Sequence, residues 1–133
     1  MSSFTPRELD YLAGQRLGRI ATVGADGTPH VVPVAFTWDD EGGIARVITS
    51  GDSQKARNVL GGGRAALCQI DGRRWLTLEG EASVLVHPEA VRDAEHRYAG
   101  RYRVPRENPA RVVIALAVDR VTGLTRLPTA PPD

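Results

Sequence analysis

The residues best suited to chemistry lie in the segment ARVITSGDSQKARN, residues 45–58. An apolar stretch there runs into Ser-Gly-Asp-Ser and then into a short predicted helix that carries Lys55 and Arg57. A helix start offers free backbone N–H groups and the positive end of its dipole to an anion, and the Ser53 hydroxyl adds a donor. This combination favours a bound phosphate. In the alternative interpretation, Asp52 or Ser53 only caps the helix and the basic side chains are solvated, and the residues alone leave both open.

A second candidate is Trp75, in the predicted hairpin LCQIDGRRWLTLEG, residues 67–80. Side chains alternate between the two faces of a strand, so Trp75 faces away from Leu76 and Leu78. An indole ring on such a face could stack on a flat heterocycle. The other interpretation is an ordinary tryptophan of the core or of an interface.

A third cluster, residues 95–111, crowds five arginines around a predicted helix end and the loop after it. Its candidate anchors are Arg97, Arg101, Arg103 and Arg106. Arginine binds carboxylates through two parallel hydrogen bonds, so a substrate or cofactor with several carboxylates would fit. Alternatively, the arginines are solvated and offset the helix dipole.

Several common catalytic motifs are absent from the sequence. It contains no Gly-x-Ser-x-Gly elbow, no Walker loop and no Gly-x-Gly-x-x-Gly fingerprint. His30, His87 and His96 have no second ligand at metal spacing, so no metal site is predicted. Cys68 is the only cysteine, which precludes an internal disulfide, and its place within a predicted strand makes a nucleophilic role improbable.

Composition limits the partners and the compartment. The chain has 133 residues and a net charge of +1, which argues against a nucleic-acid binder with a broad basic face. No apolar run approaches the roughly 20 residues that a membrane helix needs. The N-terminal residues are polar and lack the apolar stretch of a signal peptide, so we expect a cytoplasmic protein.

Strand signals dominate the elements that must position these residues. Thr5, Pro6 and Glu8 predict a capped helix that ends near residues 14–16. Two more helices are predicted over 53–60 and 88–98, and six strands over 17–23, 30–38, 44–49, 65–70, 75–86 and 112–121. Gly80 interrupts the fifth strand and predicts a bulge.

No repeating β-α-β rhythm connects these elements, so a doubly wound sheet is not expected. The pattern predicts a mostly β protein, a small antiparallel barrel of six strands with peripheral helices. We expect a single domain over residues 1–127 and a loose tail over 128–133, which holds three prolines.

Taken together, three segments carry a family resemblance. TPHVVPVAFTW, ARVITSGDSQKARN and LCQIDGRRWLTLEG resemble the cofactor-contacting stretches of the split β-barrel superfamily of pyridoxamine 5'-phosphate oxidase-like proteins. The branch that uses the deazaflavin coenzyme F420 is more similar than the branch that uses FMN. The late stretch RYRVPRENPARVVI resembles the F420-dependent biliverdin reductases in particular. The resemblance extends from the first helix to Val121, and the order and spacing of the motifs make it specific.

The resemblance implies a six-stranded split barrel that forms a homodimer, with two cofactor sites at the subunit interface. It places the cofactor against three groups of residues: the ring-facing Pro33, Val34, Ala35, Ile48 and Thr49, the phosphate-binding Ser53, Gln54, Lys55 and Arg57, and the flanking Cys68, Gln69, Trp75 and Leu76. The arginine anchors would hold a small conjugated substrate such as a tetrapyrrole, or the anionic tail of F420.

The implied activity is hydride transfer from reduced F420 to biliverdin-IXα, which gives bilirubin. The cofactor carries the hydride, so no catalytic acid or base of the protein is demanded, and the protein supplies position and electrostatics. Two alternatives remain open on the sequence: an FMN-dependent oxidoreductase on the same fold, and a non-catalytic protein that binds a flavin or deazaflavin.

Overall fold

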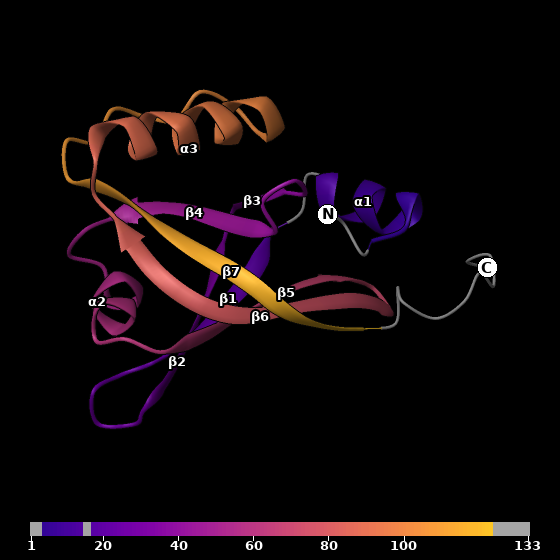
Figure 1. Cartoon of the computed structure of the whole chain (residues 1–133), viewed down its shortest axis with the longest axis horizontal. Helices are drawn as coiled ribbons and strands as arrows, with labels where there is room; N and C mark the ends of the chain where they lie inside the picture. Colours follow the sequence, from indigo (N-terminus) through magenta and orange to yellow (C-terminus); the bar gives the residue numbers. More distant parts are fainter. Residues whose placement is uncertain (1–3, 15–16, 124–133) are drawn as a thin grey trace.

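The computed structural model describes residues 4–14 and 17–123 of the chain, which form three helices and seven strands (Figure 1). In chain order these are α1 (Pro6–Ala13), β1 (Gly18–Val23), β2 (Pro29–Val34), β3 (Phe36–Asp39), β4 (Ile44–Ser50), α2 (Gln54–Leu60), β5 (Arg64–Asp71), β6 (Arg74–Leu85), α3 (Pro88–Arg101) and β7 (Arg111–Gly123). No helix in these two ranges is long and apolar enough to cross a membrane. The tail predicted at 128–133 lies outside the described residues.

All seven strands join one antiparallel sheet in the order β2-β1-β5-β6-β7-β4-β3. The mostly β fold is confirmed, but the predicted count of six strands is wrong by one. The expected strand 30–38 is two strands, because the chain changes partner at Ala35: β2 pairs with β1, whereas β3 pairs with β4. Partner exchange of this kind leaves no mark in the local pattern of apolar residues.

The two edge strands of the sheet are joined by one residue. Val34 ends β2 and Phe36 begins β3, and only Ala35 lies between them. Because two successive peptide units span at most about 7 Å, the first and last strands of the sheet must meet there. The sheet therefore curls on itself into a barrel whose seam, between β2 and β3, is a split without strand pairing.

The predicted bulge in β6 is confirmed. The register between β6 and β7 shifts between Glu79 and Gly80, and a Cβ atom at Gly80 would lie 1.8 Å from the carbonyl oxygen of Ala117. Only glycine allows this approach of two backbones. The long β6–β7 ribbon sweeps across the barrel in Figure 1, and the bulge lets it bend there.

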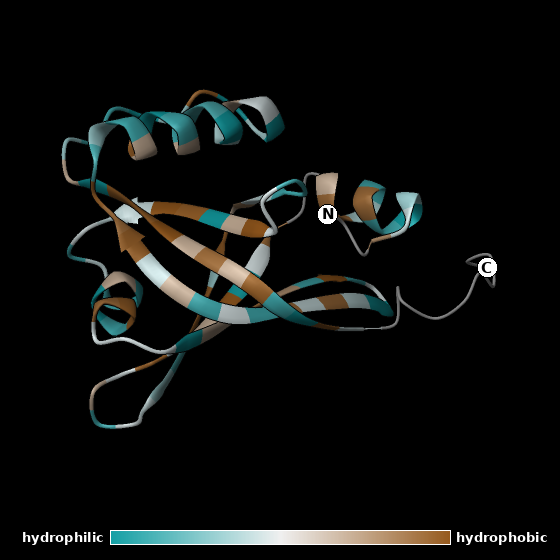
Figure 2. Ribbon diagram, in the orientation of Figure 1, coloured by the Kyte–Doolittle hydropathy of each residue, from teal (hydrophilic) through white to brown (hydrophobic). Residues whose placement is uncertain are grey.

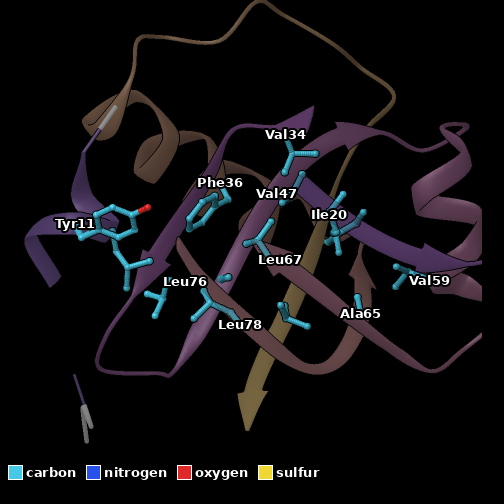
Figure 3. Packing of buried hydrophobic residues seen from close by; sticks show 14 residues of the cluster. Tyr11, Ile20, Val34, Phe36, Val47, Val59, Ala65, Leu67, Leu76 and Leu78 are labelled. Atoms are coloured by element: carbon cyan, nitrogen blue, oxygen red, sulfur yellow. The ribbon is translucent and has the colours of Figure 1, made fainter. Parts of the chain in front are cut away.

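Hydrophobic and hydrophilic residues alternate along the strands (Figure 2), and apolar side chains fill the barrel interior (Figure 3). Its largest fully buried members include Ile20, Phe36, Leu67, Leu76, Leu78 and Ile114. Trp75 and Leu76 point to opposite faces as predicted, since Leu76 is buried and Trp75 is half-buried. Gln69 is a polar exception inside, with 1% of its surface exposed.

Helix α1 starts with the predicted capping box. The Thr5 backbone N–H donates to Oε1 of Glu8 at 2.9 Å, and the Glu8 N–H donates to Oγ1 of Thr5 at 3.2 Å. The helix is held to the sheet by Tyr11, whose hydroxyl contacts the carbonyl oxygens of Gln69 and Arg74 at 3.2 and 3.1 Å.

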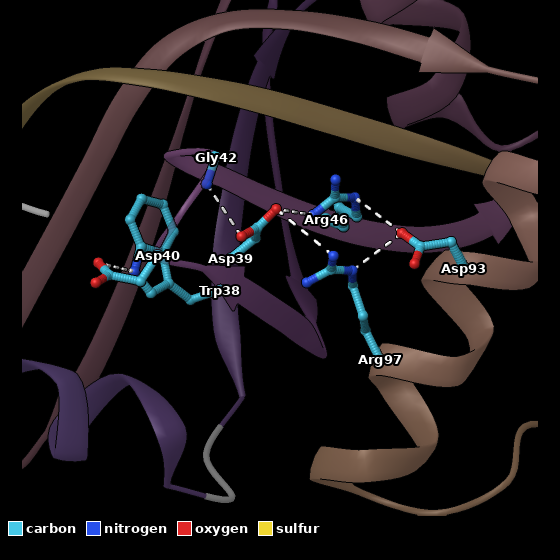
Figure 4. Close-up of polar contacts among 7 residues, drawn as sticks. All are labelled: Trp38, Asp39, Asp40, Gly42, Arg46, Asp93 and Arg97. Atoms are coloured by element: carbon cyan, nitrogen blue, oxygen red, sulfur yellow. Dashed lines mark hydrogen bonds and ion pairs between the residues drawn. The ribbon is translucent and has the colours of Figure 1, made fainter. Parts of the chain in front are cut away.

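Helix α3 lies against β3, β4 and β7, with Ala94 buried beneath it. Two arginines and two aspartates form a network of ion pairs between α3 and the strands β3 and β4 (Figure 4). Arg97 contacts Asp93 at 3.0 Å and Asp39 at 3.7 Å, and Arg46 contacts Asp39 at 3.1 Å and Asp93 at 3.9 Å. The network thereby ties the middle of α3 to β3 and β4.

Candidate functional site

A cavity of about 310 Å³ opens at the barrel seam. Its lining comes from four parts of the chain: the β2–β3 junction, β4, the start of α2, and the segment from the end of α3 to the start of β7. The lining residues are Pro33, Val34, Ala35, Val47, Ile48, Lys55, Tyr98, Arg103, Pro105, Arg106 and Arg111. The cavity thus depends on the curl of the sheet, which brings its two edges together.

One side of the cavity is apolar. Pro33, Val34 and Ala35 follow the chain across the seam, and Val47 and Ile48 belong to β4, the partner of β3. Proline and β-branched residues form a stiff surface with little side-chain freedom. Such a surface suits the face of a flat ring system.

The other side is cationic. Arg111 donates to Oε2 of Glu95 at 2.7 Å, whereas Lys55, Arg103 and Arg106 form no ion pair or side-chain hydrogen bond with any described residue. Lys55 is half-buried, and this burial lowers its pKa. Three cations around one cavity, with no carboxylate of the described chain to balance them, favour an anionic ligand.

Ser53 is the N-cap of α2, one of the two roles considered for it. Its hydroxyl oxygen accepts from the backbone N–H of Ala56 at 3.3 Å and from the Thr49 hydroxyl at 3.1 Å. Gln54 accepts from Arg57 at 2.6 Å and donates to Asn58 at 2.7 Å. These four predicted site residues, Thr49, Ser53, Gln54 and Arg57, surround Lys55 but do not line the cavity. Their contact with a cofactor remains a prediction.

The remaining predicted cofactor residues are divided between two faces of the sheet. Gln69 and Leu76 lie in the barrel interior. Cys68 and Trp75 are half-buried on the outer face of β5 and β6. None of the four lines the cavity.

The structure separates the four arginines that the sequence grouped. Arg103 and Arg106 line the cavity, whereas Arg97 and Arg101 do not. Arg97 belongs to the ion-pair network with Asp93 and Asp39, and Arg101 donates to the carbonyl oxygens of Gly14 and Phe36.

Four lining residues were not among the predicted site residues: Val47, Tyr98, Pro105 and Arg111. The arginine-rich segment contained a signal for two of them, because Tyr98 and Arg111 belong to that same cluster. Val47 and Pro105 carried no chemical signal and enter the cavity only through packing. No group of three or more His, Cys, Asp or Glu side chains that could hold a metal ion occurs in the described parts of the chain.

Comparison with known proteins agrees with this geometry. The family model described as pyridoxamine 5'-phosphate oxidase matches residues 4–125. A protein of Mycobacterium tuberculosis (strain CDC 1551 / Oshkosh), named F420H(2)-dependent biliverdin reductase, is 55% identical over 115 residues, which cover 86% of this chain and 84% of that protein.

Two further similarities are more distant. A reductase of Streptomyces rimosus subsp. rimosus, named for 5a,11a-dehydrotetracycline and 5a,11a-dehydrooxytetracycline, is 48% identical over 70 residues, about half of each chain (51% and 49%). A solved structure named F420 reductase superposes with a TM-score of 0.70 at 27% identity, covering 85% of this chain and 94% of that one. The family match spans every described residue, the whole cavity lining included, so this chain is a member of the pyridoxamine 5'-phosphate oxidase family.

Proposed function

We propose that this protein is an F420-dependent reductase that catalyses hydride transfer to biliverdin-IXα and releases bilirubin. The observation that carries the proposal is the cavity at the seam, with its apolar side at residues 33–35 and its unpaired cations Lys55, Arg103 and Arg106. F420 and biliverdin are both flat conjugated molecules with anionic groups. The 55% identity to an F420H(2)-dependent biliverdin reductase supports the same assignment.

The cavity residues fit both the ring system and the phosphate of the cofactor. Pro33, Val34, Ala35 and Ile48 would lie against the tricyclic ring, and Lys55 at the start of α2 would hold the phosphate. The lowered pKa of Lys55 reflects burial without an anion, and a phosphate beside it would relieve that penalty. When bound, reduced F420 supplies the hydride from a carbon of its ring.

In this proposal Arg103 and Arg106 bind the substrate. Biliverdin carries two propionates, and these two guanidinium groups have no partner among the described residues. They would hold the tetrapyrrole so that its central methine bridge lies against the face of the cofactor ring. Hydride transfer needs the two reacting carbons at roughly 3–3.5 Å, which is close to van der Waals contact. None of the described lining residues is Asp, Glu or His, so in this proposal the accompanying proton comes from solvent.

We further propose a homodimer built on the outer face of β1, β2 and β5. Leu17, Val23, Val31 and Ile70 are 59%, 54%, 58% and 43% exposed there. The register of β1 with β2 and β5, together with the alternation along each strand, places Val23, Val31 and Ile70 on one face of the sheet. Large exposed apolar residues that share a face favour a protein interface. Trp75 pairs with Ile70 across the β5–β6 ladder, so in the dimer it would approach the partner's site.

A cytoplasmic location is part of the proposal, and the free thiol of Cys68 agrees with a reducing compartment. The deciding assay mixes the protein with reduced F420 and biliverdin in the absence of air. We expect loss of biliverdin absorbance in step with the appearance of oxidised F420. Reduction of another acceptor, such as a quinone or unsaturated ketone, without biliverdin turnover would contradict the substrate.

Two controls address the alternatives. Parallel titrations with F420 and FMN, followed by tryptophan fluorescence, should show tighter binding of F420, and the reverse order would favour the FMN-dependent oxidoreductase. Tight binding of F420 without oxidation by any acceptor would favour a non-catalytic binding protein.

A further inference from the structure

Arg101, the last residue of α3, joins three segments that lie far apart in the sequence. Its guanidinium donates to the carbonyl oxygen of Gly14 after α1, to the carbonyl oxygen of Phe36 at the start of β3, and to Oε1 of Gln69 in β5, the last at 3.1 Å. The same group lies 4.6 Å from the centre of the Phe36 ring. Arg101 therefore bridges the end of one helix and two strands of the barrel.

Two of the three acceptors, at Gly14 and Gln69, are ones that the fold leaves in need of a donor. Gly14 caps the C-terminus of α1, where carbonyl groups have no partner inside the helix. Phe36 is the first residue after the seam, and Gln69 is buried with its amide nitrogen already donating to the Tyr11 carbonyl oxygen. A planar guanidinium with five N–H donors can serve all three at once, and an ammonium group cannot match this geometry.

Tyr102 reinforces the same anchor. Its hydroxyl donates to the Phe36 carbonyl oxygen at 2.8 Å, and burial raises the pKa of the phenol, which keeps the donor protonated. The Arg101 guanidinium also lies 5.0 Å from the Tyr102 ring. Two consecutive residues thus fix the chain to the barrel seam immediately before Arg103.

The segment that follows, residues 103–110, contains no helix or strand, yet it supplies Arg103 and Arg106 to the cavity. Its far end is also held: the Asn108 side chain donates to Oγ of Ser50 at 2.9 Å, and the Gly51 N–H donates to the Ala110 carbonyl oxygen at 2.9 Å. Between these anchors the position of the two cavity arginines depends on where the segment starts.

We propose that Arg101 is a positioning residue: it fixes the start of the 103–106 segment and so sets the affinity of the cavity for substrate carboxylates without touching the substrate. The identity of that substrate rests on the proposed function, whereas the anchoring of the segment does not. Arg101 therefore acts on binding through Arg103 and Arg106, whereas strand pairing of β2 with β1 and of β4 with β7 holds the apolar cofactor side of the cavity.

The first test needs neither cofactor nor substrate. Trypsin is added to the native protein and to Arg101→Met at a temperature well below either unfolding midpoint, and cleavage after Arg103 and Arg106 is followed by mass spectrometry. We expect cleavage about tenfold faster in Arg101→Met, since local opening is favoured by the lost contacts. The control Arg92→Met changes an exposed arginine of the same helix and should cleave at the native rate. Equal rates in Arg101→Met and the native protein would overturn the proposal.

If Arg101→Met does not fold, Arg101→Lys carries the same test, because lysine keeps the charge and the aliphatic stem. A cleavage rate clearly above the native one in Arg101→Lys supports the guanidinium geometry. A native rate in that variant means that charge alone suffices and contradicts the proposed geometry.

The second test is a double-mutant cycle on the KM for biliverdin. Arg101→Lys should raise this KM about tenfold in the native background and change it little when Arg103 and Arg106 are both alanine, because the effect passes through those side chains. The Kd for F420 should stay unchanged in every variant. An equal fold rise in this KM in the two backgrounds would overturn the proposal. If the native enzyme does not turn over biliverdin, the proposed function fails and the trypsin comparison alone decides the role of Arg101.

Discussion

Nη1 of Arg46 lies 3.1 Å from Oδ2 of Asp39, and each of the two side chains is only 14% exposed. The pair sits where β3 and β4 turn, and Arg97 and Asp93 of α3 complete the network. Partial burial reduces solvent screening, so this network contributes more than an exposed pair would. It connects the helix that leads to the cavity arginines with the sheet that supplies the apolar wall.

The network predicts an acid-sensitive contribution to stability. The hydrogen bond from the Gly42 backbone N–H, together with Arg46 and Arg97, lowers the pKa of Asp39 below its ordinary value of 3.8. The unfolded chain therefore takes up this proton first, so the contribution is present above pH 3.8 and is lost as the pH falls through the lower folded pKa. We expect Asp39→Asn to lower the free energy of unfolding by roughly 1–3 kcal/mol at pH 7, with a smaller difference at pH 3. Urea denaturation at both pH values checks this, with exposed Asp10→Asn as a control that should match the native protein.

Lys55 should lower the free energy of unfolding of the ligand-free protein and strengthen the binding of F420. Burial lowers its pKa, so the unfolded chain binds more protons between the lowered pKa and 10.5, and the stability of the ligand-free protein rises with pH across that window. Lys55→Met should leave this protein at least as stable as the native one at pH 7 and remove the rise. The same variant should bind F420 roughly 10- to 150-fold more weakly, the loss of one charge-assisted contact. Thermal melting and a fluorescence titration measure the two effects, and an unchanged Kd would place the phosphate elsewhere.

Arg106 should act on the substrate more than on the cofactor. We expect Arg106→Ala to raise the KM for biliverdin by roughly 10- to 150-fold and to leave the Kd for F420 unchanged. A fall in F420 affinity that steepens with added salt would instead show that the side chain grips the anionic tail of the cofactor. Arg92→Met, on the exposed face of α3, is the matched control for removal of a positive charge.

Gly80 is the position least able to accept a side chain. A Cβ atom there would lie 1.8 Å from the Ala117 carbonyl oxygen, so the β6 and β7 backbones would have to separate. We expect Gly80→Ala to destabilise the protein by about 1–3 kcal/mol or more. Gly100→Ala, in α3 with no atom near the added methyl, should be stabilising by roughly 0.5–1 kcal/mol. Equal unfolding midpoints for the two variants would contradict the packing at the bulge.

The proposed dimer predicts a molar mass near twice the 14.4 kDa of one chain in light scattering. Val31→Glu places a charge on β2 within the exposed apolar face, which should shift the mass toward one chain because an unpaired charge is costly in an interface. Val86→Glu, at an equally exposed valine outside that face, should leave the mass unchanged. A native mass of 14.4 kDa at micromolar concentration would contradict the dimer.

Local features of the fold followed from the sequence because they depend on residues close along the chain. The capping box joins Thr5 to Glu8, three positions later, and the cap of α2 joins Ser53 to Ala56 in the same way. The bulge at Gly80 needed only a glycine within a strand pattern. Lys55 was placed at a helix start by the same local signals, and the structure brings it to the cavity.

The tertiary structure decided which arginines face the cavity and where the barrel closes. Arg101 and Arg103 are two residues apart in one basic cluster, yet Arg101 meets Phe36, 65 positions earlier, while Arg103 meets the cavity. Likewise, the predicted strand 30–38 divides at Ala35 because its two halves, β2 and β3, form the two opposite edges of the sheet and pair with β1 and β4. Composition and periodicity describe each residue with its neighbours along the chain, whereas these outcomes depend on acceptors and strand edges that only the folded chain brings together.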